Sequence, residues 1–116
     1  MRLLALCLAL LLAACGEPRA SGPIGRGRQV YQDKNCAACH WIDSTGSTAG
    51  PDLTHIATVA AARRADQSAE AYIRESITDP GAYIVPGYPD TMGRGLARSL
   101  SEEDLAALIA YLLTLK

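Results

Sequence analysis

Apolar residues recur at helical spacing near the C-terminus of the chain. The stripe they form, at positions i, i+3, i+4, i+7 and i+8, consists of Leu105, Leu108, Ile109, Leu112 and Leu113. Ser101 precedes the stripe. Asp104 lies three residues after Ser101, the spacing of a capping box, with Asp in place of the usual Glu or Gln. This pattern predicts an amphipathic helix that begins just after Ser101 and buries one face.

Other segments of the chain show weaker helical patterns. They are residues 26–35, 54–62 and 68–78. For the last of these, Ser68 is a suitable N-cap and Pro80 a stop. The one strand candidate, residues 82–85, is cut off by Pro86. The hydrophobic pattern therefore predicts an all-α fold with long loops.

The N-terminus carries a different pattern, an unbroken apolar run at residues 3–14 that follows Arg2. The run is shorter than the roughly 20 apolar residues that a spanning helix needs. A positive start, a short apolar stretch and small residues at its end are typical of a secretory signal peptide. A buried core helix is the alternative, but the run has no amphipathic face.

The run ends in Leu12-Ala13-Ala14-Cys15, which resembles the lipobox of bacterial lipoproteins. The resemblance implies that residues 1–14 are a lipoprotein signal peptide and that Cys15 is lipidated. Several acyl chains on that cysteine would give a lasting membrane attachment. The residue after Cys15 is Gly16 rather than Asp, which in Gram-negative bacteria would weakly favour sorting of the lipoprotein to the outer membrane. Residues 15–25 are rich in Gly and Pro, which predicts a flexible tether between the lipid and a domain at residues 26–116.

Composition limits what the domain can do. The formal net charge is −1 and no basic block occurs, so nucleic-acid binding has no support. Aromatic residues make up 5% of the chain, with one Trp and no Phe. A domain of this size has a marginal core of its own. We therefore expect a bound group to complete the interior.

The candidate chemistry lies in the stretch NCAACH, where Cys36, Cys39 and His40 are separated by helical spacings of three and four. All three side chains can therefore face one object. Covalent haem, a zinc site and a dithiol redox motif are the alternatives. Zinc needs a fourth ligand, and His55 is the remaining candidate. A dithiol oxidoreductase needs a sheet, which the pattern does not predict.

Cysteine and methionine counts favour haem. Of the four cysteines, Cys7 leaves with the signal peptide and Cys15 carries lipid, which leaves one pair for two thioethers. His40 is then the proximal ligand. Of the two methionines, only Met92 remains after export. It lies in GYPDTMGRG, which is too polar and glycine-rich for a core segment. Met92 is the expected sixth ligand, and His55 is the alternative.

Residues 25–116 resemble the class I c-type cytochromes in motif and in order. The first motif comprises Gly27, Val30 and Tyr31, which precede Cys36 as in the first helix of that family. Further matches are the CxxCH motif, Gly50-Pro51-Asp52-Leu53, Tyr88-Pro89 with Met92, and residues 105–112. The chain looks most like the cytochrome c domains fused to terminal oxidase subunit II. The resemblance implies a small class I fold whose N- and C-terminal helices cross at Gly27 around one haem c.

The resemblance also implies roles for single residues. The carbonyl of Pro51 would accept the proximal imidazole N–H, which fixes the ring and raises its basicity. The family usually has Pro after the ligand Met, whereas this chain has Gly93, so we expect a more labile Met92 bond. Apart from the resemblance, one of the arginines at positions 63 and 64, or Tyr88, is a candidate partner of the haem propionates, because Arg binds planar carboxylates well; the alternative is that these residues form part of the solvated surface. Trp41 would either shield the haem edge or simply pack.

These features predict an electron carrier in the bacterial cell envelope, tethered to the membrane through lipid on Cys15, with one haem c bound by Cys36 and Cys39 and ligated by His40 and Met92. Its partners would be redox proteins of the envelope, and it would not itself be an enzyme. Two alternatives remain open. One is a haem enzyme or small-ligand sensor with a labile Met92. The other is a fixed electron-transfer subunit of a larger oxidoreductase.

Overall fold

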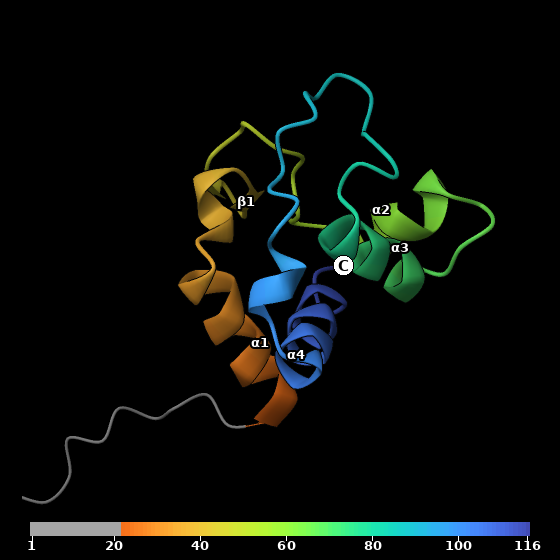
Figure 1. Cartoon of the computed structure of the whole chain (residues 1–116). Helices are drawn as coiled ribbons and strands as arrows, with labels where there is room; N and C mark the ends of the chain where they lie inside the picture. The colour runs from red at the N-terminus through yellow and green to blue at the C-terminus, as the bar shows by residue number, and fades with distance from the viewer. Residues whose placement is uncertain (1–21) are drawn as a thin grey trace, which may run out of the picture.

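The computed structural model describes residues 22–116 as a set of short helices with one small hairpin (Figure 1). In chain order the elements are α1 (Gly22–Asp33), η1 (Cys36–Ala38), β1 (Trp41–Ile42), β2 (Thr45–Gly46), α2 (Ile56–Arg63), α3 (Ala69–Thr78), η2 (Ala97–Ser99) and α4 (Glu102–Leu112). The predicted all-α fold is confirmed.

The C-terminal helix α4 forms as its pattern predicts. The Ser101 hydroxyl accepts a hydrogen bond from the backbone N–H of Asp104 at 3.0 Å, which satisfies one of the free amides of the first turn. Acidic residues occupy that turn, where the helix dipole favours negative charge. The members of the stripe are buried except Leu113, which is half-buried. One face of α4 is therefore a wall of the core.

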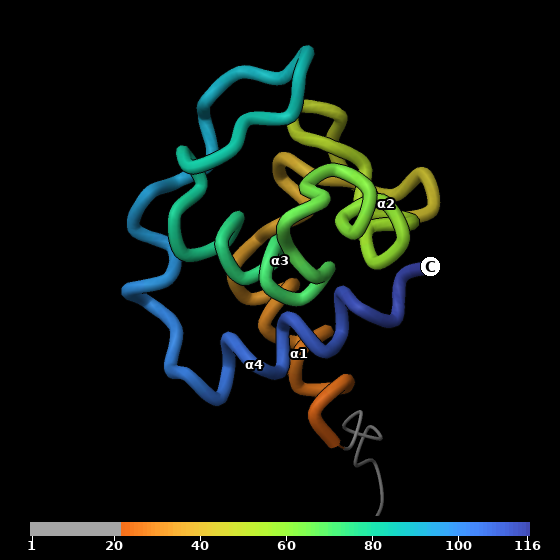
Figure 2. The backbone as a smooth tube through the Cα atoms, turned by 90° about the vertical axis from the view of Figure 1, so that its right-hand side faces the viewer, coloured from red at the N-terminus to blue at the C-terminus, as the bar shows by residue number. Residues whose placement is uncertain are grey.

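Helices α1 and α4 cross at Gly27, and both views show the two helices in contact (Figures 1 and 2). A Cβ atom on Gly27 would overlap the backbone carbonyl of Ala107 and lie 2.7 Å from Cβ of Tyr111. The ring centroids of Tyr31 and Tyr111 lie 6.0 Å apart at an interplanar angle of 65°, an edge-to-face contact. The close approach of these helices therefore requires a residue without a side chain at position 27.

Ion pairs at the rim support the same crossing. Arg26 pairs with Glu103 at 2.6 Å and with Asp104 at 2.7 Å. The hydrogen bond from Arg26 holds the pKa of the Asp104 carboxyl below its ordinary value, and burial opposes this only in part. Exposed pairs of this kind contribute little to stability. They fix the register of α1 against α4 more than they strengthen the crossing.

Two helix starts differ from the sequence prediction. Helix α1 begins at Gly22, four residues before position 26, so the end of the expected tether at residues 22–25 is helical. Helix α2 begins at Ile56, two residues after position 54. Asp52 accepts hydrogen bonds from the N–H and the hydroxyl of Thr54 at 2.7 and 2.6 Å. This local turn holds Thr54 outside the helix, because it offers the backbone an alternative partner.

A β-hairpin between η1 and α2 was missed by the sequence pattern. Strands β1 and β2 pair Trp41 with Gly46 and Ile42 with Thr45 in antiparallel register. The turn residues Asp43 and Ser44 both have left-handed backbones, with φ of 48° and 65°. Two-residue strands are too short for a recognisable alternation, and Asp-Ser is a weaker turn signal than Asn-Gly or Asp-Gly.

The core lies among α1, α2, α3 and α4, and α2 packs beside α3 (Figure 2). Helix α3 is capped as predicted, since the Ser68 hydroxyl accepts from the N–H of Ala71 at 3.1 Å. The segment between α3 and α4 contains only the short η2 and arches over the top of the molecule in Figure 1. Within residues 22–116, every helix is too short or too polar to cross a membrane.

Candidate haem-binding site

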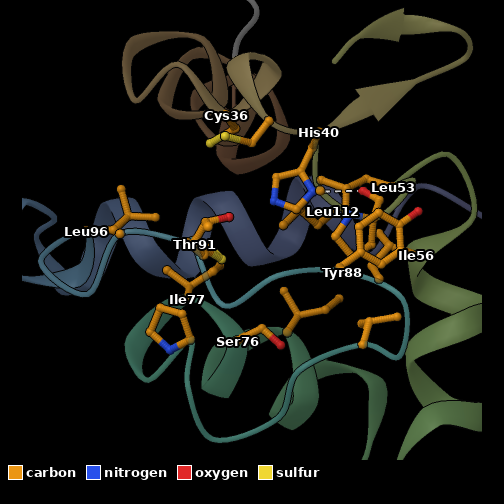
Figure 3. A pocket seen from close by; sticks show the side chains of 18 of the residues that line it. Cys36, His40, Leu53, Ile56, Ser76, Ile77, Tyr88, Thr91, Leu96 and Leu112 are labelled. Carbon is orange, nitrogen blue, oxygen red and sulfur yellow. Dashed lines mark hydrogen bonds between the residues drawn. The ribbon is translucent and has the colours of Figure 1, made fainter. Parts of the chain in front are cut away.

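A cavity of about 530 Å³ opens between the core and the segment that links α3 to α4 (Figure 3). Its wall is largely apolar and includes side chains from α1, α2, α3 and α4. Cys36, Cys39, His40 and Met92 all line this cavity. The fold thus brings Met92, which is more than fifty residues from His40 in the sequence, to the same site as the CxxCH motif. A cavity of this size and lining is typical of a cofactor site.

The cysteines and the histidine are placed by a sharp turn at the end of α1. Asn35 adopts a left-handed backbone with φ of 54°, which ends the helix and redirects the chain into η1. The N–H groups of Cys39 and His40 then both donate to the carbonyl of Cys36, at 3.1 and 2.9 Å. This single tight turn is the local structure that holds all three side chains at the cavity.

His40 is oriented by a hydrogen bond to the backbone. Its Nδ1 lies 2.8 Å from the carbonyl oxygen of Pro51 (Figure 3). A carbonyl can only accept, so Nδ1 carries the proton and donates, and Nε2 keeps its lone pair. Nε2 is therefore the nitrogen that can bind a metal. The contact with Pro51 is the one that the family resemblance implied, and it fixes both the tautomer and the ring orientation.

Gly50 contributes a feature of the site that the sequence did not reveal. A Cβ atom at this position would lie 2.9 Å from Cε1 and 3.1 Å from Nδ1 of His40. The N–H of Gly50 also donates to the carbonyl of Cys39 at 2.6 Å. The backbone at Gly50 thus lies directly against the imidazole ring and leaves no room for a side chain, which only a glycine permits. Its position directly before Pro51 was the only sequence signal available.

The two thiols differ in exposure and neither forms a disulfide. Cys36 is half-buried and Cys39 is exposed. Burial raises the pKa of the Cys36 thiol above its ordinary value. A dithiol oxidoreductase instead needs a thiolate stabilised by a lowered pKa. The hairpin β1–β2 is the only sheet in residues 22–116, and it does not resemble the βαβ unit that carries such motifs.

The zinc alternative also lacks geometric support. Within the described residues 22–116, no cluster of three or more His, Cys, Asp or Glu side chains is placed to hold a metal ion. The fourth ligand considered from the sequence, His55, is exposed at the N-cap of α2 and lies outside the cavity wall. Because His55 lies outside the cavity wall, it is also not placed to bind a haem iron together with His40.

Met92 occupies the long segment after α3. It is half-buried, lines the cavity and packs against the core. Thr91, next to it, also lines the cavity and is labelled in Figure 3, as is His40. A single thioether is therefore available in the wall of the same cavity as the imidazole. The pair can supply one nitrogen and one sulfur donor.

The neighbouring arginines are not equivalent. Arg63 lines the cavity, and its guanidinium lies 3.3 Å from the hydroxyl of Tyr72. Arg64 lies outside the cavity wall and pairs with Asp66 at 3.3 Å and Glu75 at 3.5 Å. Of these two arginines, Arg63 is the one placed to meet an anionic group in the cavity. Tyr88, the other candidate, also lines it.

Trp41 does not line the cavity. It is half-buried in strand β1, its indole N–H is buried without a hydrogen-bond partner among the described residues, and its carbonyl accepts from the N–H of Leu53 at 2.9 Å. A packing role, rather than shielding of the haem edge, is therefore consistent with its place.

The donor set fits haem c. Two thiols at CxxC spacing can form thioethers, an imidazole with a free Nε2 can bind iron, and the wall around them is apolar. The fold and the site together define a haem-binding electron-transfer domain. A family model described as cytochrome c matches residues 24–116, and the chain belongs to that family. Its cofactor is haem c, bound covalently through Cys36 and Cys39.

A curated relative supports the same assignment. Cytochrome c oxidase subunit 2 of Alkalihalophilus pseudofirmus is 36% identical to this chain over 95 residues. The match covers 78% of this chain and 25% of the relative. The chain therefore spans a quarter of the length of the relative it matches, which accords with the resemblance to subunit II cytochrome domains.

Proposed function

We propose that this protein is a membrane-tethered electron carrier of the bacterial cell envelope, with one haem c ligated by His40 and Met92. The observation that carries the proposal is the presence of the Met92 thioether in the wall of the cavity that His40 enters. Bound haem c supplies a one-electron ferric/ferrous couple. If His40 and Met92 both bind the iron, they would leave it no open coordination site for a substrate, which favours carriage over catalysis.

The residues around the cavity would set the potential of the bound group. The bond from His40 to Pro51 raises the basicity of the imidazole. A thioether stabilises ferrous iron relative to a second nitrogen donor, so ligation by Met92 raises the potential. Apolar side chains such as Ile56, Ile77 and Leu108 line the cavity and exclude water. These residues would act by positioning the iron ligands and by keeping water out of the cavity. Transfer of an electron would require no proton transfer by the chain.

The tether belongs to this proposal as an expectation from the sequence. Cys15 and the apolar run before it lie outside the described residues 22–116. Lipid on Cys15 would confine the domain to a membrane surface and raise its effective concentration near membrane-bound partners. Those partners would be redox proteins of the envelope. The similarity to an oxidase subunit makes a terminal oxidase the first candidate acceptor.

A second candidate is supported by the same relative. Cytochrome c oxidase subunit 2 contains this domain as a quarter of its length. The chain would then be a fixed electron-transfer subunit of a larger oxidoreductase. Purification from membranes in mild detergent distinguishes the two functions. A carrier elutes alone, whereas a fixed subunit elutes with a large partner.

Replacement of Met92 tests the ligation. Oxidised holoprotein should show the weak near-infrared iron–sulfur band of a His/Met haem. Met92→Ala should abolish that band, lower the reduction potential and allow carbon monoxide to bind the reduced protein rapidly. His55→Ala is the matched control, because His55 is exposed and outside the cavity wall. If His55→Ala alters the spectrum and Met92→Ala does not, ligation is bis-His and the carrier works at low potential.

A further inference from the structure

The segment that carries Met92 has few attachments to the rest of the domain. From position 86 to position 95 it contains no helix or strand, and most of its side chains are exposed. Its backbone hydrogen bonds are all local, for example Thr91 N–H to Pro89 at 3.0 Å and Leu96 N–H to Gly93 at 3.4 Å. From this stretch only Met92 packs against the core, and Leu96 follows just after it. Side-chain contacts must therefore determine how firmly Met92 is held.

Gly93 gives Met92 no support on its C-terminal side. A Cβ atom at this position would meet no atom within 4 Å, and its backbone is not in the left-handed region. Neither close packing nor backbone conformation requires a glycine here. Glycine leaves the backbone freer than any other residue, so this position favours movement of the neighbouring ligand.

Arg94 compensates for this freedom. Its guanidinium forms an ion pair with Asp90, and the two residues flank Met92 at two positions on either side. The same guanidinium rests against Gly81, just beyond the end of α3, where a Cβ atom would overlap it. One side chain therefore joins both ends of the Met92 turn and presses that turn against the segment after α3. We call Arg94, Asp90 and Gly81 the Arg94 clasp.

We propose that Arg94 is a positioning residue for Met92, and that the Arg94 clasp sets how readily the thioether leaves the iron. This inference rests on the proposed ligation by Met92. The side chains of Arg94 and Asp90 are 55% and 44% exposed, so the ion pair is of modest strength and is weakened by salt. The clasp therefore adjusts the rate of ligand release and does not choose the ligand.

Gly81 provides a way to disturb the clasp without changing a charge. Its backbone is not left-handed, so alanine is tolerated there, and the methyl group would displace only the end of the flexible Arg94 side chain. Arg94→Gln removes the charge, and Arg94→Lys retains it. Arg98→Gln is the matched control, because Arg98 is a nearby exposed arginine in η2 that forms no ion pair with any residue from 22 to 116.

The experiment measures imidazole binding to the oxidised holoprotein by loss of the near-infrared iron–sulfur band, under conditions where release of Met92 limits the rate. Arg94→Gln and Gly81→Ala should each bind imidazole about two- to fivefold faster than the wild type, the range that exposed ion pairs support. Arg94→Lys and Arg98→Gln should stay within about twofold of the wild type, and high salt should bring the wild type toward Arg94→Gln.

The outcomes separate this inference from the function on which it rests. A wild-type protein without the iron–sulfur band overturns ligation by Met92, and the clasp with it. A wild-type protein with the band, whose binding rate is unchanged in Arg94→Gln and Gly81→Ala, overturns the clasp alone. Equal acceleration in Arg94→Gln and Arg98→Gln also overturns it, because the effect would then be one of general charge.

Discussion

At the scale of single residues, the site follows from a few short-range constraints. His40 is turned by Pro51 and backed by Gly50, both close to it in sequence. The Pro51 contact was expected from the family resemblance. The Gly50 contact was not, because the sequence shows only that Gly50 precedes Pro51 and not how closely its backbone approaches the ring. The difference between Arg63 and Arg64 was not predictable. Arg63 ends α2, whereas Arg64 has an extended backbone, with φ of −132° and ψ of 101°, which turns its side chain toward Asp66.

Arg63 should therefore influence the bound haem more than Arg64 does. Its positive charge at the cavity wall favours the reduced state, so Arg63→Gln should lower the reduction potential by about 20–60 mV, where a tenfold change in a one-electron equilibrium is about 59 mV. Arg64→Gln removes the same charge outside the cavity and should shift the potential less. Potentiometric titration of both variants decides the matter, and equal shifts would contradict a special role for Arg63.

At the scale of elements, the sequence predicted the helix caps that depend only on neighbouring residues. Ser68 and Ser101 cap α3 and α4 as expected, because a hydroxyl and an amide three residues apart need no tertiary structure to meet. The hairpin β1–β2 and the early start of α1 escaped prediction. Strands of two residues leave no alternation to detect, and the first turn of α1, GPIG, consists largely of residues with poor helix propensity.

The crossing of α1 and α4 leads to a prediction for Gly27. Gly27→Ala places a methyl group against the carbonyl of Ala107, and a backbone atom cannot move aside as a side chain can. We expect the free energy of unfolding to fall by about 1–3 kcal/mol, although alanine is the better helix former. Chemical denaturation of the holoprotein measures this value.

Gly95→Ala is the control for that experiment. A Cβ atom there would lie 3.5 Å from the guanidinium of Arg98, an ordinary contact. Its unfolding free energy should stay within about 0.5 kcal/mol of the wild type. If Gly27→Ala is as stable as this control, the helices separate easily and the close crossing does not limit stability.

At the scale of the whole molecule, the order of the elements explains how so small a chain holds a large cofactor. The turn that follows α1 supplies the cysteines and His40, the segment after α3 supplies Met92 to the same cavity, and α4 contributes Leu108 and Leu112 to the cavity wall. The buried apolar side chains include Leu, Ile, Val and Tyr but no Phe, as the sequence dictates. The cavity of about 530 Å³ lies among them, so the cofactor completes the core that composition alone left marginal.

Our proposal that a lipid attaches this domain to a membrane concerns residues outside those described, and it is tested at Cys15. If the lipobox resemblance is correct, Cys15→Ser should abolish incorporation of labelled fatty acid and block or divert processing. Cys7→Ser is the matched control, because Cys7 lies within the apolar run that a lipoprotein signal peptidase would remove, and lipidation should persist. The near-infrared spectrum of the haem should be unchanged in both variants, since Cys36 and Cys39 are untouched. Fatty acid found on the Cys15→Ser protein would mean that the domain reaches its partners by another attachment.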